Sequence, residues 1–240
     1  MGIAKKKIIL FQLPYQEFNY TKQGSKWGNT PWGAAMLKAM AHQEGLTEIF
    51  DIEILPTDVV DRIGDALLID YLEALQPDIL GATLYLWNSQ RSLYIAEQLK
   101  ARLPNLLCIV GGPEVHESST YIVDNTAVDF ACIGEGEEVF VAILRAIAEG
   151  SLPAPLPGLL WKQHGRIMPC YGQGCVSDLD RIPSPLHMGI ITPRNESIVS
   201  YETTRGCPCT CSYCVAGAIP WRTFPRTGSW RTWRCSTNTG

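Results

Sequence analysis

The sequence predicts an α/β domain with a doubly wound parallel sheet of flavodoxin-like or Rossmann-like type, over about the first 150 residues. Short apolar runs alternate with stretches of helical spacing, and this unit recurs five times. Strands that alternate with helices in this way imply a parallel sheet with helices on both faces. In such sheets ligands gather outside the carboxyl ends of the strands, at the switch in strand order.

Composition limits the classes of function. The chain has 240 residues, which is room for one large domain or for one domain plus part of another. Apolar residues make up 46% and charged residues 18%, so a buried core is expected. A net charge of -4 gives no sign of nucleic-acid binding, and no run approaches a membrane helix in length. Nine cysteines without an export signal favour a reducing compartment, with the cytoplasm as the default.

The expected elements follow in order. Apolar runs predict strands over 8–12, 49–55, 79–86, 106–110 and 128–133. A helix is expected to begin at Thr30-Pro31, with a capping hydroxyl and proline at the first helical position, and to run to about residue 44. Further helices are expected over 66–75, from Asn88-Ser89 to about 103, and over 138–148.

Three loops should lie at the carboxyl ends of these strands, over 13–29, 111–116 and 134–137. A glycine pair after a strand, such as Gly111-Gly112, lets a flat ligand approach the backbone closely. Such pairs are common, so this one is weak evidence by itself.

Residues 151–196 differ in character. Pro153, Pro155 and Pro157 predict a stiff extended link. The runs 159–162 and 166–168 predict a small hairpin, while Cys170 and Cys175 are interpreted as incidental thiols. We therefore expect a domain over 1–150, a linker over 151–196 and a third segment over 197–240.

The third segment contains Cys207, Cys211 and Cys214, separated by three and then two residues. Thiolates this close suit a metal or cluster better than a disulfide, and three ligands leave one site of a four-iron cluster open. The run 197–202 predicts a strand leading into this loop. Zinc is the alternative, with Cys209 or Cys235 as a fourth ligand.

This loop resembles the cluster loop of the radical S-adenosylmethionine (SAM) enzymes. The resemblance implies that the three cysteines hold a 4Fe-4S cluster, that SAM takes the fourth iron, and that Tyr213 lies against its adenine. It implies one-electron reductive cleavage of SAM to a radical, and hence an electron donor as partner. The cofactors carry that chemistry and the protein positions them. Cys209 departs from the pattern, because the family usually has a bulky residue there.

Two turns extend the resemblance. An Ile-Val-Gly-Gly-Pro-Glu turn, an Asp-Phe-Ala-Cys-Ile-Gly-Glu-Gly-Glu turn and the cysteine loop come in that order. The order resembles the cobalamin-binding subclass of radical SAM proteins, over residues 1 to about 225, in which methylcobalamin often delivers a methyl group. The resemblance implies cobalamin-binding residues at Thr83, Tyr85, Gly111, Gly112, Gly134, Glu135 and Glu137. No histidine precedes His42, so the cobalt-ligating Asp-x-His-x-x-Gly motif is missing.

The chain ends 26 residues after Cys214, whereas a partial (β/α) barrel needs on the order of 200 residues. These residues hold four arginines, three tryptophans and no acidic residue, and show no strand alternation. The hypothesis is a frameshift near Arg226, which would leave a truncated, inactive or partial enzyme with an incomplete radical SAM barrel. The alternatives are a genuine basic and aromatic tail that binds a partner, a cobalamin-binding module without radical catalysis, or a zinc-binding interaction protein.

Overall fold

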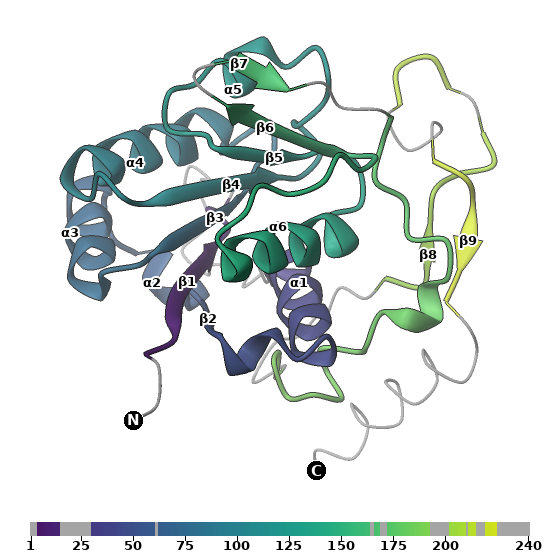
Figure 1. Cartoon of the computed structure of the whole chain (residues 1–240). Helices are drawn as coiled ribbons and strands as arrows, with labels where there is room; N and C mark the ends of the chain where they lie inside the picture. Colours follow the sequence, from purple (N-terminus) through teal and green to yellow (C-terminus); the bar gives the residue numbers. More distant parts are fainter. Residues whose placement is uncertain are drawn as a thin grey trace, which may run out of the picture.

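The computed structural model describes residues 4–14, 30–60, 62–163, 166–168, 172–192, 202–209, 211–214 and 219–224. Its main sheet has seven strands in the order β2-β1-β3-β4-β5-β6-β7 (Figure 1). The strands are β1 (Lys6–Phe11), β2 (Phe50–Ile54), β3 (Ile79–Thr83), β4 (Leu107–Gly111), β5 (Phe130–Cys132), β6 (Leu159–Gln163) and β7 (Arg166–Met168).

The strands β1 to β5 are all parallel, which confirms the predicted α/β sheet. The chain goes from β1 outward to β2 and then returns to β3 on the other side of β1, so the strand order switches there. Both faces of β1 are buried, with Ile9 and Phe11 in one core cluster and Ile8 and Leu10 in the other. Burial on both faces explains why these strands are continuously apolar.

Helices cover both faces of the sheet (Figure 1). One face carries α1 (Trp32–Gln43) and α6 (Glu137–Glu149), and the other carries α2 (Thr57–Val60), α3 (Asp65–Leu75), α4 (Ser89–Arg102) and α5 (Thr120–Val123). The four longer helices lie within two residues of their predicted bounds. Among the described residues, no helix is both long and apolar enough to cross a membrane.

The predicted start of α1 is wrong in detail. Pro31 is the N-cap residue and not the first helical residue, and no side chain forms a cap hydrogen bond. The main chain supplies the first hydrogen bonds instead, because Thr30 O accepts from Trp32 N and Pro31 O accepts from Ala35 N.

The strand expected over 79–86 ends at Thr83. A turn replaces its last residues, because Asn88 Oδ1 accepts a hydrogen bond from Tyr85 N (2.8 Å). The Asn88 amide also donates to Leu13 O (2.9 Å), and the side chain is buried. Asn88 is the N-cap residue of α4, but its side chain forms no cap hydrogen bond and instead joins the chain after β1 to the chain after β3.

The predicted hairpin forms as β6 and β7, and β6 pairs antiparallel with β5. The main sheet therefore continues beyond residue 150. The segment after the hairpin also packs on the domain, because Val176, Leu179 and Ile182 form a small apolar cluster with Met36 of α1.

A second, two-stranded sheet consists of β8 (Thr204–Arg205) and β9 (Arg222–Thr223). The strand expected over 197–202 falls almost wholly on residues outside the described part of the chain. The tail after Cys214 shows no strand alternation in its sequence, yet Arg222 and Thr223 form the short strand β9 and pair with Arg205 and Thr204. The supposed frameshift near Arg226 lies outside the described residues.

Candidate functional site at the carboxyl edge of the sheet

Two of the predicted site residues lie side by side at the strand ends. Thr83, the last residue of β3, is the register partner of Gly111, the last residue of β4. The next residue, Gly112, has a φ of 112°, and a Cβ there would lie 2.6 Å from Leu84 O and 2.9 Å from Leu84 N. Only glycine fits this turn, so the backbone at this edge carries no side chain.

The turn after β3 presents aromatic surface beside these glycines. The Tyr85 and Trp87 rings stack with their centroids 4.6 Å apart. Leu86 is 79% exposed and Trp87 49% exposed, so this turn presents apolar surface to solvent. Burial raises the pKa of the Tyr85 hydroxyl, and the negative charge of Glu202 raises it further.

The turn after β5 packs against the segment that follows the β6–β7 hairpin and forms hydrogen bonds with it. Gly134 has a φ of 82°, and a Cβ on it would lie 2.6 Å from Gly174 O. Glu135 N donates to Gly174 O (2.9 Å), and Gly174 N donates to Ile133 O (2.8 Å). These contacts leave room for no side chain at Gly134 and fix the direction of the two glutamates that follow.

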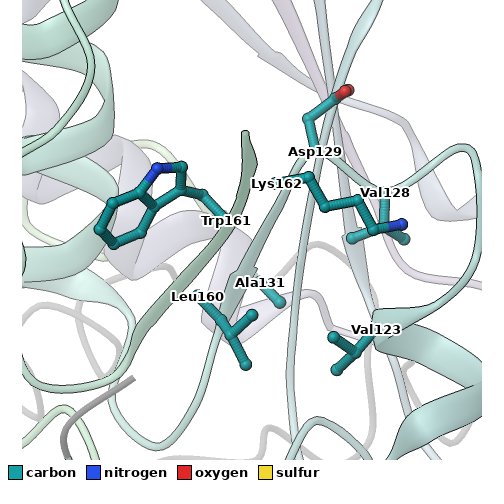
Figure 2. Close-up of a pocket in the computed structure, with 7 residues that line it drawn as sticks. All are labelled: Val123, Val128, Asp129, Ala131, Leu160, Trp161 and Lys162. Carbon is teal, nitrogen blue, oxygen red and sulfur yellow. The ribbon is translucent and has the colours of Figure 1, made fainter. Parts of the chain in front are cut away.

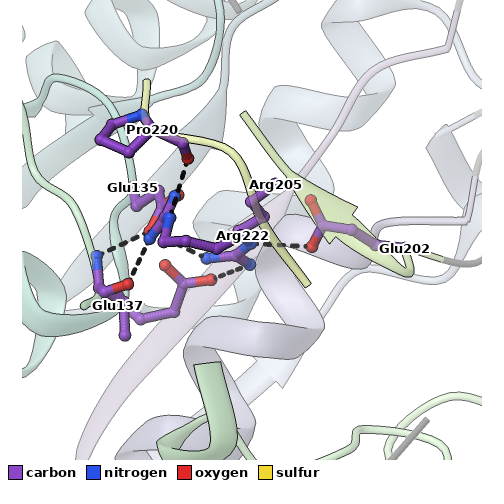
Figure 3. A network of polar contacts seen from close by, with 7 residues as sticks. Glu135, Glu137, Glu202, Arg205, Pro220 and Arg222 are labelled. Carbon is purple, nitrogen blue, oxygen red and sulfur yellow. Dashed lines mark hydrogen bonds and ion pairs between the residues drawn. The ribbon is translucent and has the colours of Figure 1, made fainter. Parts of the chain in front are cut away.

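The glutamates of this turn contact two arginines from β8 and β9 (Figure 3). Glu137 Oε1 accepts from Arg205 Nη2 (2.6 Å), and Glu135 Oε2 lies 3.5 Å from Arg205 Nη1. Arg222 donates to both Glu135 oxygens, and Val176 N donates to Glu135 Oε2 (2.7 Å). Glu135, Glu137, Arg205 and Arg222 are called the ion-pair cluster below.

The ion-pair cluster is largely out of solvent. The side chains of Arg205, Glu135 and Glu137 are each less than a tenth exposed. Burial would raise the pKa of Glu135, but hydrogen bonds from Arg222 and Val176 N outweigh it and hold that pKa below its usual range. Burial would lower the pKa of Arg205, but the charge of Glu137 outweighs it and raises that pKa. The formal charges of the two carboxylates and the two guanidinium groups sum to zero.

Glu202 lies at the rim of the ion-pair cluster. Its Oε2 accepts from Arg205 Nε (3.0 Å), and its side chain is 39% exposed. Burial raises its pKa, while the charge of Arg205 acts in the opposite direction.

The cysteine loop, from Cys207 to Cys214, begins directly after β8. Gly206 has a φ of 76°, and a Cβ on it would lie 2.3 Å from Pro220 O, so glycine is required where the loop closes. Cys207 is half-buried, whereas Cys211, Cys214 and Tyr213 are exposed. Within the described residues, no three Cys, His, Asp or Glu side chains are already gathered as metal ligands. The assignment of the three cysteines as cluster ligands stays a prediction.

The other described cysteines differ from these three. Cys108 and Cys132 are buried in the core, and burial raises the pKa of the Cys108 thiol to about 12. A thiol with so high a pKa is a poor ligand, since the thiolate binds metals. Cys175 is exposed, and Cys170 and Cys235 lie outside the described residues.

A small pocket lies elsewhere, at the amino end of β5 (Figure 2). It is lined by Val123, Val128, Asp129, Ala131, Leu160, Trp161 and Lys162. Asp129 Oδ2 is already bound by Lys100 Nζ (2.5 Å) and Cys108 N (2.7 Å). The pocket is at the edge opposite to the glycine turns, so we do not assign the candidate site to it.

Sequence reasoning missed Arg205, Arg222 and Glu202 as parts of the site. Arg205 comes directly before Gly206-Cys207. Its position beside the cysteines marked it as notable, but the sequence did not show which acidic residues it contacts. Arg222 was read as part of a basic tail. The fold brings the predicted Glu135 and Glu137 to these arginines, which lie 68 and 87 residues away in the sequence.

Comparison with known proteins agrees with this geometry. Residues 29–144 match the sequence model of the B12 binding domain family. These residues form a B12-binding domain. The match ends within α6, so it covers β2 to β5 and the turns at Gly111-Gly112 and Gly134–Glu137.

Sequence relatives of the B12-binding domain and its C-terminal extension are cobalamin-dependent radical SAM enzymes. The chain is 27% identical over 207 residues to the cobalamin-dependent radical SAM methyltransferase TokK of Streptomyces tokunonensis, covering 81% of this chain and 29% of that protein. It is 29% identical over 152 residues to the 2-(S-pantetheinyl)-carbapenam-3-carboxylate methyltransferase of Streptantibioticus cattleyicolor, covering 59% and 22%. The chain thus spans less than a third of these two relatives.

Solved structures show the same fold. The cobalamin-dependent SAM radical enzyme OxsB with aqua-cobalamin bound matches with a TM-score of 0.72 at 16% identity, covering 96% of this chain and 31% of that one. The radical SAM methyltransferase TsrM from Kitasatospora setae, with cobalamin and a 4Fe-4S cluster bound, matches with a TM-score of 0.64 at 15% identity, covering 96% and 45%.

Proposed function

We propose that this chain binds cobalamin at the carboxyl edge of its sheet and holds a radical SAM cluster in the adjacent cysteine loop. It would thereby serve a cobalamin-dependent reaction of the methyltransferase type. One observation carries the proposal: β8, which leads into the cysteine loop, docks on the turn after β5. Two motifs that suggest two cofactors therefore share one edge of one sheet.

The cobalamin side of the proposal uses the strand ends. Thr83, Gly111, Gly112 and Gly134 would line the contact, because this backbone carries little side-chain bulk. Tyr85 would add an aromatic wall through its stack with Trp87. Glu135 and Glu137 would lie beside the cofactor, with their carboxylates bound by Arg205 and Arg222.

The cluster side uses the loop. Cys207, Cys211 and Cys214 would hold a 4Fe-4S cluster, and the exposed Tyr213 would lie against SAM. When bound, the cluster supplies the electron for SAM cleavage and cobalamin supplies the methyl group. β8 and β9 hold the two ends of the loop together, and Gly206 allows the close approach to Pro220 that this requires. β8 would correspond to the first strand region of a partial (β/α) barrel.

A second candidate is a cobalamin-binding module without radical catalysis. It is favoured by the extent of the family match, which ends at residue 144 and leaves the cysteine loop outside it. We also propose that the residues that contact cobalamin all lie within 1–150 and that the cluster segment runs from 197 onward, while the hairpin of β6 and β7 completes the sheet of the first domain.

Anaerobic reconstitution with iron and sulfide tests the cluster. We expect a four-iron absorption and spin signal that changes when SAM is added. Replacing Cys207, Cys211 or Cys214 by alanine should abolish the signal, because three thiolates are needed to hold the cluster. The matched control is Cys209→Phe, which should keep the signal.

Whether the protein retains hydroxocobalamin on a desalting column tests the proposed cobalamin site independently of the cluster. Retention without a cluster signal would support the module and overturn radical chemistry. Zinc alone in elemental analysis, with no retained cobalamin, would overturn both.

A further inference from the structure

The two strands that close the cysteine loop place like charges directly opposite each other. Arg205 and Arg222 are register partners in the antiparallel pair β8–β9. Like charges in directly opposed positions destabilise a ladder, and a two-stranded ladder of this length has little stability of its own. The loop base therefore needs stabilisation from outside.

That stabilisation comes from the B12-binding domain. Glu135 lies in the turn after β5 and Glu137 is the first residue of α6, and their carboxylates neutralise the two guanidinium groups. Each arginine contacts carboxylates through more than one nitrogen, a geometry that suits the planar guanidinium fork and not a lysine ammonium. Phe224 adds an aromatic face 5.6 Å from the Arg205 guanidinium carbon.

Each buried charge of the ion-pair cluster depends on an opposite charge beside it. Glu137 is nearly fully buried, and its Oε2 has no hydrogen-bond partner among the described residues. A buried guanidinium that loses its carboxylate is strongly unfavourable, because no water replaces the lost charge. The carboxylates of Glu135 and Glu137 therefore offset the repulsion between the two facing arginines.

We propose that the ion-pair cluster couples closure of the cysteine loop to the turn after β5, with Arg205 and Arg222 as positioning residues for the loop. The cysteine loop closes only when β8 and β9 are docked on the B12-binding domain. By linkage, a ligand that stabilises this turn also stabilises the loop, and the reverse holds. The ligand part of this inference rests on the proposed function, whereas the coupling in the ligand-free chain does not.

Hydrogen–deuterium exchange on the ligand-free chain tests the coupling. The reporting amides are Phe224 N, bonded to Thr203 O (3.1 Å), and Cys207 N, bonded to Ile219 O (3.4 Å). We expect Glu137→Gln to accelerate exchange over 202–209 and 219–224 by about tenfold or more, with peptides of β1 to β5 little changed. The matched control is Glu138→Gln, which removes the exposed ion pair to Arg181 (2.9 Å) one residue further on and should change neither region.

A double-mutant cycle separates coupling from general damage. In the double variant Glu137→Gln with Arg205→Gln, exchange over 202–209 and 219–224 should be slower than the sum of the two single-variant effects predicts, because both charges are then removed. In the variant Arg205→Lys, the amides of 202–209 and 219–224 should be less protected from exchange than in the parent chain. If Glu137→Gln fails to fold, Arg222→Gln serves instead, since it changes no residue of the family-matched domain.

Hydroxocobalamin is the probe for the ligand part. It should slow exchange over 202–224 in the parent chain and leave Glu137→Gln unaffected. Failure of hydroxocobalamin to bind would count against the proposed function and leave the ligand-free result standing. Unchanged exchange in ligand-free Glu137→Gln, or equal acceleration in Glu138→Gln, would overturn the coupling itself.

Discussion

Single glycines decide whether the ligand edge can form. At Gly112 the φ of 112° disfavours any L side chain, and the atoms that a Cβ would meet are backbone atoms of Leu84, which cannot swing aside. The substitution therefore strains both β4 and the turn after β3. The neighbouring Gly111 has an ordinary φ, and its nearest contact would be Cys132 Cβ at 3.4 Å.

Gly112→Ala should lower the free energy of unfolding by about 2–3 kcal/mol, because it combines backbone strain with a backbone clash. Urea denaturation monitored by circular dichroism measures this change. Gly111→Ala is the matched control and should change the free energy of unfolding by less than about 1 kcal/mol. Equal losses for the two variants would contradict the role assigned to the turn at Gly112.

At the scale of elements, the charges of the turn after β5 hold β8 and β9 in place. The pKa of Glu135 is lowered in the folded protein, so its ionised form stabilises the fold above the unfolded pKa of about 4.3. That contribution is lost as the pH falls through the folded pKa. The raised pKa of Glu202 acts in the opposite sense, since folding favours its protonated form.

Glu135→Gln should therefore be most damaging at neutral pH. We expect a loss of about 3 kcal/mol near pH 7, where a buried arginine is left uncompensated, and a smaller loss below about pH 4. Urea denaturation of parent and variant between pH 3.5 and 7 measures the difference at each pH. The control Glu73→Gln lies in an exposed pair with Arg102 and should cost less than about 1 kcal/mol. A loss for Glu135→Gln that does not diminish toward acid pH would refute the assigned ionisation.

For the whole molecule, the buried residues of the two main cores extend through β6, and Met168 of β7 packs against one of these cores. Leu160 belongs to one core cluster, and Leu159 and Trp161 belong to the other. The third cluster ends at Ile182, apart from a peripheral contact from Phe224. The ion-pair cluster and the cysteine loop thus lie outside the hydrophobic cores.

Shortened chains should reflect this division. A chain of residues 1–192 should still unfold cooperatively, because it keeps all three apolar clusters. Its midpoint in urea should be lower than that of the parent chain, because it loses the ion pairs of Glu135 and Glu137 to Arg205 and Arg222. A chain of residues 1–150 loses the buried side chains of Leu159, Leu160 and Trp161 from the two main cores, worth about 5–9 kcal/mol together. This is comparable to the total stability of about 5–15 kcal/mol expected of a domain. This chain also loses Val176, Leu179 and Ile182 of the third cluster. It should aggregate or remain unfolded, and a cooperative unfolding transition in it would show that the hairpin is dispensable.

Local pattern determined much of this protein. Apolar runs and helical spacing depend on near neighbours, so the five parallel strands, the four longer helices and the hairpin were predictable from sequence. Strand ends were less so, because the side chain of Asn88, which holds the turn after β3, is itself bound to Leu13 O, 75 residues away. The spacing of Cys207, Cys211 and Cys214 likewise indicates cluster chemistry without any fold.

Only the tertiary structure decided what Glu135 and Glu137 contact. The sequence placed them in a cofactor turn and placed Arg205 and Arg222 in a separate segment. The fold brings these four side chains into one buried, neutral group. Charge pairing across 68 or more residues leaves no periodic trace in the sequence, because it depends on where the sheet edge and the cysteine loop meet in space.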